Sequence, residues 1–281
     1  MRGPILVFGA TGVHGGAVAR AMLEAGYPVA AFVRDPRSEH ALAIAGDGAR
    51  LVVGDLEDGA SVSRALEQID VAYAVTTPFE DGAEGEIRQG TQILASATEV
   101  QLPWLMLASV ASAARAEVPH FQSKARIEQL LRQSALTWTV VAPTYFYENV
   151  LGARREIRDG RLPLALPSQT PLQQVALQDL GALVVAILSR AEEHAGERVE
   201  VAGDSPTPEQ MAKAMGVRHQ EVSVAEVAQR SPDVAAMYSF LAREGYAVDI
   251  DALRRRYPEV AWRSFAGWAA TIDWRGDATC G

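Results

Sequence analysis

Residues 5–38 read ILVFGATGVHGGAVARAMLEAGYPVAAFVRDPRS, and this stretch decides the fold. A short apolar run over residues 5–8 is followed by a glycine cluster and an alanine-rich amphipathic stretch, which predicts a helix over residues 15–25. A second apolar run over residues 28–33 stops at Arg34. A strand, a helix and a second strand in this order form the repeating unit of a parallel sheet.

The glycines between the first strand and the helix have the spacing G-x-x-G-x-x-G, at Gly9, Gly12 and Gly15. Gly9 permits a tight turn, Gly12 lets the main chain approach a diphosphate, and Gly15 lets the helix pack closely on the strand. The free N–H groups at the start of the helix then face the phosphates. Because a strand precedes the loop and a helix follows it, the loop predicts dinucleotide binding. The alternative is a structural glycine turn without a ligand.

Arg34 stands where the second strand ends. An acidic residue at this position accepts hydrogen bonds from the adenosine ribose and selects NAD, whereas an arginine pairs with the 2′-phosphate of NADP. Arg37 adds a second positive group nearby, and Asp35 complicates the assignment because it lies at the same strand end. We therefore expect NADP(H) as the cofactor. The alternative is a surface arginine paired with Asp35.

The alternation of strands and helices continues to about residue 143. Short apolar segments rich in β-branched or aromatic residues occupy residues 4–9, 28–33, 50–55, 71–77, 103–109 and 137–143, and helical stretches occupy residues 15–25, 61–68, 86–98 and 121–133. Continuous apolar runs suit strands that are buried on both faces. The prediction is an α/β fold, a doubly wound parallel sheet (Rossmann) with a small C-terminal α+β or helical substrate lobe.

We expect residues 1–150 to form the dinucleotide-binding domain and residues 151–281 to form a substrate or lid region that packs on it. Parts of residues 170–203 are expected to contribute to the first domain. Asp179 precedes an apolar-periodic run and is the expected N-cap of a helix there.

Further cap residues mark a helix near residue 208. Thr207 and Gln210 have the spacing of a capping box, Pro208 is the first helical residue, and Gly216 ends the segment. Residues 232–274 are expected to be mostly helical. Their aromatic residues are more typical of packing than of a binding box: Trp262, Phe265, Trp268 and Trp274.

The composition excludes several function classes. The chain has 281 residues and a formal net charge of −9, so it lacks the excess of Lys and Arg that nucleic-acid binding needs. The one cysteine, Cys280, permits neither an intramolecular disulfide nor a cysteine-rich metal site. No His or carboxylate spacing suggests a metal, and no apolar run has the length of a membrane span. We expect a cytoplasmic protein.

The segments GATGVHG, FVRDP, VVGDLED, HFQSKARIEQLLRQSALTWTVVAPTYFYENV and QVALQDLGALVVAIL together resemble the NmrA-like branch of the atypical short-chain dehydrogenases/reductases. The resemblance covers roughly residues 4–216. It implies a diphosphate loop, an adenine site, a nicotinamide ribose site with a lysine, and a nicotinamide and substrate face. The implied diphosphate loop consists of Gly9, Ala10, Thr11, Gly12, Val13 and His14, and the implied adenine site consists of Asp55 and Leu56. The nicotinamide ribose site would be formed by Thr76, Thr77, Pro78 and Lys124. The nicotinamide and substrate face would be formed by residues 143–149, including Pro143 and Tyr145.

Three positions depart from the family or are less specific. His120 stands four residues before Lys124, where active short-chain dehydrogenases have the tyrosine that protonates the substrate oxygen. The candidate proton donors are His120, Tyr145 and Tyr147. The alternative for His120 is a polar residue at a helix start, and the alternative for the two tyrosines is packing. Ala142 occupies a strand end that often carries arginine. Ser109 resembles the active-site serine of the superfamily, although many strand ends carry a serine.

Two functions fit these residues. The first is an NADPH-dependent reductase that delivers hydride to a quinone or another conjugated carbonyl, since such an acceptor delocalises charge and needs less help from a side-chain acid. The second is a non-catalytic NADP(H) redox sensor that acts through a protein partner. The acid-rich segment at residues 79–86 is expected to be solvated and mobile, with gating of the substrate cleft as the alternative. Oligomer formation stays open.

Overall fold

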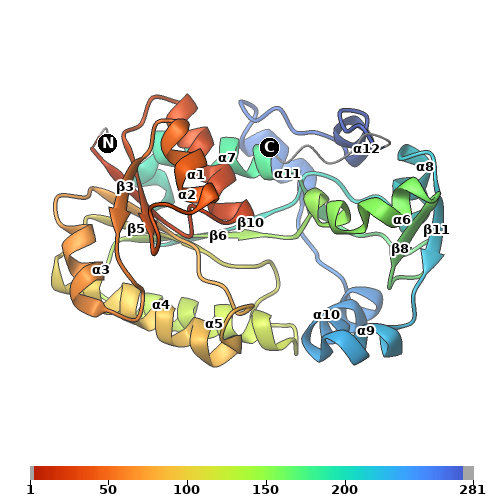
Figure 1. The fold of residues 1–281 in the computed structure, drawn as a ribbon, viewed down its shortest axis with the longest axis horizontal. Helices are drawn as coiled ribbons and strands as arrows, with labels where there is room; N and C mark the ends of the chain where they lie inside the picture. The colour runs from red at the N-terminus through yellow and green to blue at the C-terminus, as the bar shows by residue number, and fades with distance from the viewer. Residues whose placement is uncertain (1–2, 275–281) are drawn as a thin grey trace.

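The computed structural model describes residues 3–274, and its centre is a seven-stranded parallel sheet in the order β10-β6-β5-β4-β1-β2-β3 (Figure 1). The strands are β1 (Ile5–Phe8), β2 (Val29–Val33), β3 (Arg50–Val53), β4 (Val71–Ala74), β5 (Trp104–Ala108), β6 (Trp138–Pro143) and β10 (Glu197–Val201). The chain order reverses between β1 and β4, which is the point where ligands bind in open parallel sheets. The predicted doubly wound α/β fold is confirmed.

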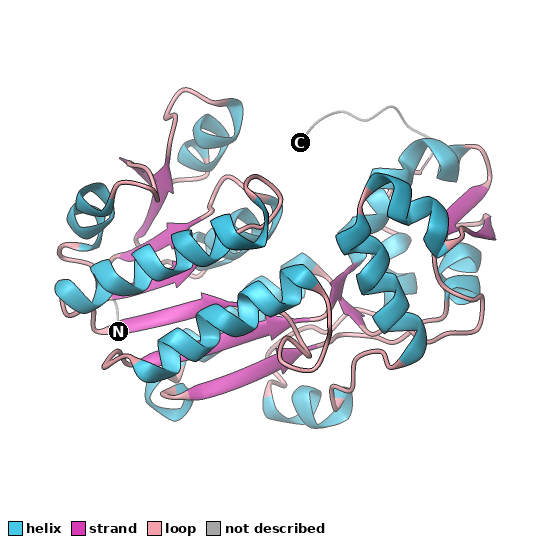
Figure 2. Cartoon of the chain, turned by 90° about the horizontal axis from the view of Figure 1, so that it is seen from below, coloured by secondary structure: helices cyan, strands magenta, loops and turns pink. Residues whose placement is uncertain are grey.

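Helices cover both faces of this sheet (Figure 1). The first face carries α1 (Val13–Glu24), α2 (Glu39–Gly46) and α7 (Leu177–Ser189), and the second carries α3 (Gly59–Leu66), α4 (Gly82–Glu99) and α5 (Pro119–Gln133). Alternate residues of β1 serve the two faces: Ile5 and Val7 pack in one core, and Leu6 and Phe8 pack in the other. Figure 2 views the sheet from the second face and shows the two long helices α4 and α5 lying side by side in front of the strands.

The remaining elements form a lobe at one end of the sheet and an extension over the first face (Figures 1 and 2). They are β7 (Tyr145–Phe146), the 3-10 helix η1 (Tyr147–Ala153), α6 (Arg154–Arg158), β8 (Arg161–Leu164), β9 (Gln174–Val175), the 3-10 helix η2 (Ala191–His194), α8 (Pro208–Ala214), β11 (Arg218–Glu221), α9 (Val224–Arg230), α10 (Pro232–Arg243), α11 (Ile250–Arg256) and α12 (Phe265–Ala269). The segment from Leu253 to Val260 packs in the core of the first face. The division of the chain into two domains at residue 150 stays a prediction.

The helix expected to begin after Asp179, at residue 180, begins three residues earlier, so its predicted cap is wrong. Ala176 is the N-cap of α7, and Asp179 lies inside the first turn. Its carboxylate is 1% exposed and accepts a 2.7 Å hydrogen bond from the backbone N–H of Arg263, whose guanidinium also contacts it. The carboxylate therefore fixes the C-terminal segment to α7 instead of capping the helix.

The other cap predictions are confirmed. Thr207 accepts a hydrogen bond from the N–H of Gln210, whose side chain accepts one from the N–H of Thr207. Pro208 is the first residue of α8, and Gly216 ends the segment with a φ of 70°. The packing role of the aromatic set is also supported, because Phe265 and Trp268 are buried. Cys280 lies outside the described residues.

Candidate functional site

The loop between β1 and α1 has the geometry that its glycines predict. Gly9 has a φ of 73°, and its carbonyl accepts a 3.0 Å hydrogen bond from the N–H of Gly12, which closes a tight turn. A Cβ atom on Gly15 would lie 2.3 Å from the carbonyl oxygen of Gly9, so only glycine fits there. A Cβ atom on Gly12 would have only this oxygen near it, at 3.4 Å. Gly12 therefore faces open space rather than the protein.

The start of α1 is suited to an anion. Gly12 is the N-cap and has no side chain to accept from the first-turn N–H groups, which have no acceptor within the helix. Thr11 and Gly12 are exposed, as is Val13 at 72%, whereas Ala10 is buried. The loop thus presents main-chain N–H groups and the positive end of a helix dipole to the solvent, and these groups fit a diphosphate.

The side chain of His14 points back into the protein. Its Nε2 lies 2.8 Å from the hydroxyl of Tyr73 on β4, and its ring also contacts Phe146 edge to face. Burial and the nearby positive charge of Lys124 lower the pKa of His14 to about 3. His14 is therefore neutral at ordinary pH, and it joins α1 to β4 while its backbone remains part of the loop.

Arg34 and Arg37 both lie beyond β2, but their ion pairs differ from the expected one. Arg34 pairs with Glu80, with 2.8 Å between Nη2 and Oε1, and not with Asp35. Asp35 instead faces Arg37 at 3.7 Å and also accepts a hydrogen bond from its backbone N–H. The side chains of Arg34 and Arg37 are 66% and 90% exposed. Both guanidinium groups are therefore accessible to a ligand at this end of the site.

Asp55 and Leu56 follow β3 and form a local turn. The carboxylate of Asp55 accepts a 3.0 Å hydrogen bond from the N–H of Glu57, and its N–H donates to the hydroxyl of Ser61. Leu56 is partly buried against the core of the second face. Their expected place beside the adenine stays a prediction.

Lys124 reaches from α5 to the carboxyl end of β4. Its Nζ lies 2.7 Å from the backbone oxygen of Thr76, 3.1 Å from the Thr76 hydroxyl and 2.7 Å from a carboxylate oxygen of Glu86. The carboxylate also accepts hydrogen bonds from the hydroxyls of Thr76 and Ser123. Thr77 and Pro78 follow, both partly buried. The ammonium is thus fixed by three acceptors at the end of β4.

Glu86 corrects the interpretation of residues 79–86 as a solvated segment. The helix α4 begins at Gly82 rather than at Glu86, and Glu86 is fully buried. Only Phe79, Glu80 and Asp81 form an exposed stretch before the helix. Reasoning from the sequence missed Glu86 because nothing in its own neighbourhood sets it apart from the other acids. The available signal was that Lys124, if buried, needs an acidic residue such as Glu86 as its counter-ion.

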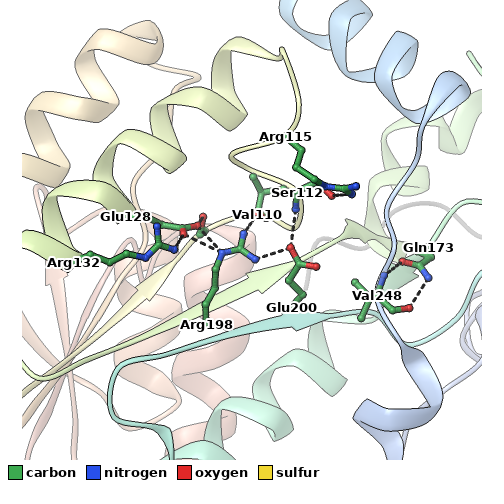
Figure 3. A network of polar contacts seen from close by, with 10 residues as sticks. Val110, Ser112, Arg115, Glu128, Arg132, Gln173, Arg198, Glu200 and Val248 are labelled. Atoms are coloured by element: carbon green, nitrogen blue, oxygen red, sulfur yellow. Dashed lines mark hydrogen bonds and ion pairs between the residues drawn. The ribbon is translucent and has the colours of Figure 1, made fainter.

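Ser109 belongs to a second network of polar contacts. Its hydroxyl donates to Glu128 on α5, which is 2% exposed. Figure 3 shows Arg198 between two carboxylates: its Nε lies 3.0 Å from Glu128, and its Nη1 lies 2.6 Å from Glu200. Arg132 also contacts Glu128, at 2.6 Å. The network joins α5 to β5 and β10, and the assignment of Ser109 to the cofactor stays a prediction.

The candidate proton donors are engaged with the C-terminal lobe. The Nδ1 atom of His120 lies 2.7 Å from the carboxylate of Asp233, which also accepts from the His120 backbone N–H. The hydroxyl of Tyr145 lies 3.1 Å from that of Tyr238, and burial raises the pKa of Tyr145 well above its usual value. Tyr147 donates to a backbone oxygen, that of Arg263.

The site lies along the carboxyl edge of the sheet. Because all seven strands are parallel, the residues that follow β1, β2, β4, β5 and β6 share this edge, including buried Pro143 at the end of β6. Among residues 3–274, no group of three or more His, Cys, Asp or Glu is placed to hold a metal ion. No helix in the described part of the chain has the length and apolar character needed to cross a membrane.

Comparison with known proteins places this architecture in a family. Residues 1–242 match the model of the NmrA-like family, so the chain belongs to that family, as the sequence motifs indicated. Over 202 residues it is 31% identical to a (4-alkanoyl-5-oxo-2,5-dihydrofuran-3-yl)methyl phosphate reductase from Streptomyces griseus. The match covers 71% of this chain and 67% of that reductase.

Two solved structures share the fold. An NADPH-dependent quinone oxidoreductase from Escherichia coli, solved with NADPH, is similar with a TM-score of 0.81 and 20% identity, over 95% of this chain and 98% of that one. NmrA, a negative transcriptional regulator, is similar with a TM-score of 0.79 and 18% identity, over 98% of this chain and 99% of that one. An enzyme and a regulator therefore share this architecture.

Proposed function

We propose that the protein binds NADP(H) along the carboxyl edge of its sheet and acts as an NADPH-dependent oxidoreductase. The observation that carries the proposal is the open glycine loop after β1, with an accessible guanidinium beyond β2 on one side and a fixed ammonium beyond β4 on the other. These groups match the diphosphate, the 2′-phosphate and the nicotinamide ribose in that strand order. When bound, NADPH supplies a hydride.

The residues of this chain bind and orient the dinucleotide. The first-turn N–H groups of α1 hold the diphosphate, and Gly12 leaves room for it. Arg34, with Arg37, holds the 2′-phosphate by charge-assisted hydrogen bonds. Thr76, Thr77 and Pro78 line the nicotinamide ribose, and Lys124 presents a fixed positive charge beside it.

We infer that the hydride acceptor is a quinone or another conjugated carbonyl. Position 120 holds a histidine whose Nδ1 is paired with Asp233, and the hydroxyls of Tyr145 and Tyr147 have partners within the protein. An acceptor that spreads the developing negative charge depends less on a side-chain acid, because solvent can protonate it. The relative from Streptomyces griseus is named a reductase, which supports a reductase function for this protein.

A non-catalytic NADP(H) sensor is the second candidate. Its support is the engagement of all three candidate donors with the C-terminal lobe, together with the likeness of the fold to a transcriptional regulator. Such a protein would transmit cofactor occupancy to a protein partner. It would need different affinities for the reduced and oxidised cofactor, or a shape change linked to binding.

One experiment separates the two candidates. The purified protein is mixed with NADPH and a panel of quinones and simple ketones, and the loss of reduced nicotinamide absorbance is followed. Lys124→Met, verified as folded by circular dichroism because it leaves Glu86 without its partner, is the control for adventitious reduction. We expect turnover with quinones, little with ketones, and a large loss in the variant. No turnover with any acceptor, combined with unequal affinities for NADPH and NADP⁺, would support the sensor instead.

A further inference from the structure

Glu80 forms an ion pair with Arg34, the residue whose guanidinium binds the 2′-phosphate in the proposed function. The Arg34 Nη2 and Glu80 Oε1 atoms are 2.8 Å apart, and the two side chains are 66% and 46% exposed. Asp35, the nearer acid in sequence, is engaged with Arg37. Glu80 is therefore the acid that neutralises Arg34 in this structure.

The pair bridges the candidate cofactor site. Arg34 follows β2, and Glu80 follows β4. β1 lies between these two strands in the sheet, so a contact between their carboxyl ends passes across the end of β1, where the glycine loop begins. The ion pair consequently spans the place where the proposed function puts the diphosphate and the adenosine.

Residues 77–81, which we call the strap, are held differently at their two ends. On one side, Thr76 is buried and bonded to Lys124 and Glu86. On the other, Asp81 is the N-cap of α4. Within the strap, Glu80 forms its ion pair with Arg34 on the surface. Between them, Phe79 is 75% exposed, with its ring centroid 6.1 Å from that of His120. Both ends of the strap thus join packed structure, and the ion pair of Glu80 is exposed to competition from a ligand.

We propose that Glu80 is a specificity-determining residue that holds Arg34 until a 2′-phosphate displaces it. The inference rests on the proposed function. An exposed carboxylate–guanidinium pair contributes little free energy, whereas a phosphate carries nearly two charges and can bind the guanidinium with two hydrogen bonds. A ligand without the phosphate leaves Arg34 on Glu80. Glu80 therefore weakens binding of the phosphorylated ligand, and its displacement releases the strap beside His120.

Calorimetry with adenosine 2′,5′-bisphosphate and adenosine 5′-phosphate tests the inference. Glu80→Gln should bind the bisphosphate about two- to fivefold more tightly than wild type, the range expected for an exposed ion pair. Its affinity for the monophosphate should not change. Glu84→Gln is the matched control, because it removes the same charge from an exposed position four residues further on, in the first turn of α4. In an Arg34→Ala background, Glu80→Gln should have no effect.

Hydrogen exchange of the strap amides gives an independent readout. The bisphosphate should speed exchange in residues 77–81 of the wild type, the monophosphate should not, and Glu80→Gln should exchange fast without ligand. Equal gains in Glu80→Gln and Glu84→Gln, or a gain that persists without Arg34, would overturn the inference alone. Failure of the folded wild type to bind the bisphosphate or NADPH would overturn the proposed function as well.

Discussion

The Nζ atom of Lys124 lies 2.7 Å from the carboxylate of Glu86, a residue with no exposed surface. The lysine side chain itself is 13% exposed. Two opposite charges that are removed from water hold each other in place, and either one left alone would be costly. This pair, together with Thr76, fixes the ammonium at the carboxyl end of β4.

Glu86→Gln should destabilise the protein. The amide retains the shape of the side chain but leaves Lys124 without a counter-ion, so we expect a loss of about 3 kcal/mol in the free energy of unfolding. Denaturant titration measures it. Glu84→Gln, on the exposed face of the same helix, should cost less than about 1 kcal/mol. Equal losses in the two variants would show that the buried pair is not the cause.

Two alanine substitutions in the glycine loop should impair different properties, one the stability of the fold and the other the binding of NADPH. In Gly15→Ala the new Cβ would lie 2.3 Å from the Gly9 carbonyl oxygen, so the thermal midpoint should fall by several degrees or more. Gly12→Ala meets only one atom, at 3.4 Å, and should fold normally. It should still weaken NADPH binding by about tenfold, because the diphosphate must approach the main chain there. Normal NADPH affinity in Gly12→Ala would argue against the assigned diphosphate position.

His14 should make the fold sensitive to acid. Its pKa is about 3 in the folded state against 6.5 ordinarily, so between these values the unfolded chain holds one more proton. Stability is therefore present above about pH 6.5 and falls as the pH is lowered, by up to about 1.4 kcal/mol per pH unit from this group. His14→Gln lacks the group, and its unfolding free energy should fall less steeply between about pH 6 and 4.5. Parallel curves would refute the assignment.

Arg198 should contribute more to the free energy of unfolding than Arg132, although both contact the carboxylate of Glu128. Arg198→Met leaves the carboxylates of Glu128 and Glu200 without their shared partner, and we expect a loss of about 2–4 kcal/mol. The side chain of Arg132 is twice as exposed, at 44% against 22%, and Arg132→Met should cost about 1 kcal/mol or less. Chemical denaturation of the two variants compares them, and a reversed order would contradict the central place of Arg198.

The fold was predictable because its signals are local. The glycine spacing from Gly9 to Gly15, the apolar runs on either side and the capping box at Thr207 each lie within a few residues. The same reasoning failed at Asp179, because the helix starts three residues earlier and the expected cap has a distant partner. That partner, Arg263, is brought near by the fold and not by the sequence.

The partners within the site were not predictable for the same reason. Arg34 and Glu80 are 46 residues apart, and His120 and Asp233 are 113 apart. Glu86 looks like any other residue of an acidic segment, and only the packing of α4 against α5 buries it beside Lys124. The sequence could therefore indicate which residues follow each strand, whereas the pairs among them depend on the order of the strands.

The most direct test of the central claim is a calorimetric titration of the wild type and of Arg34→Ala with NADPH and NADH. The account predicts saturable binding of NADPH to the wild type, tighter than that of NADH by about tenfold or more, and a loss of this preference in Arg34→Ala. Absence of saturation with NADPH on folded protein, or an unchanged preference in the variant, would contradict it.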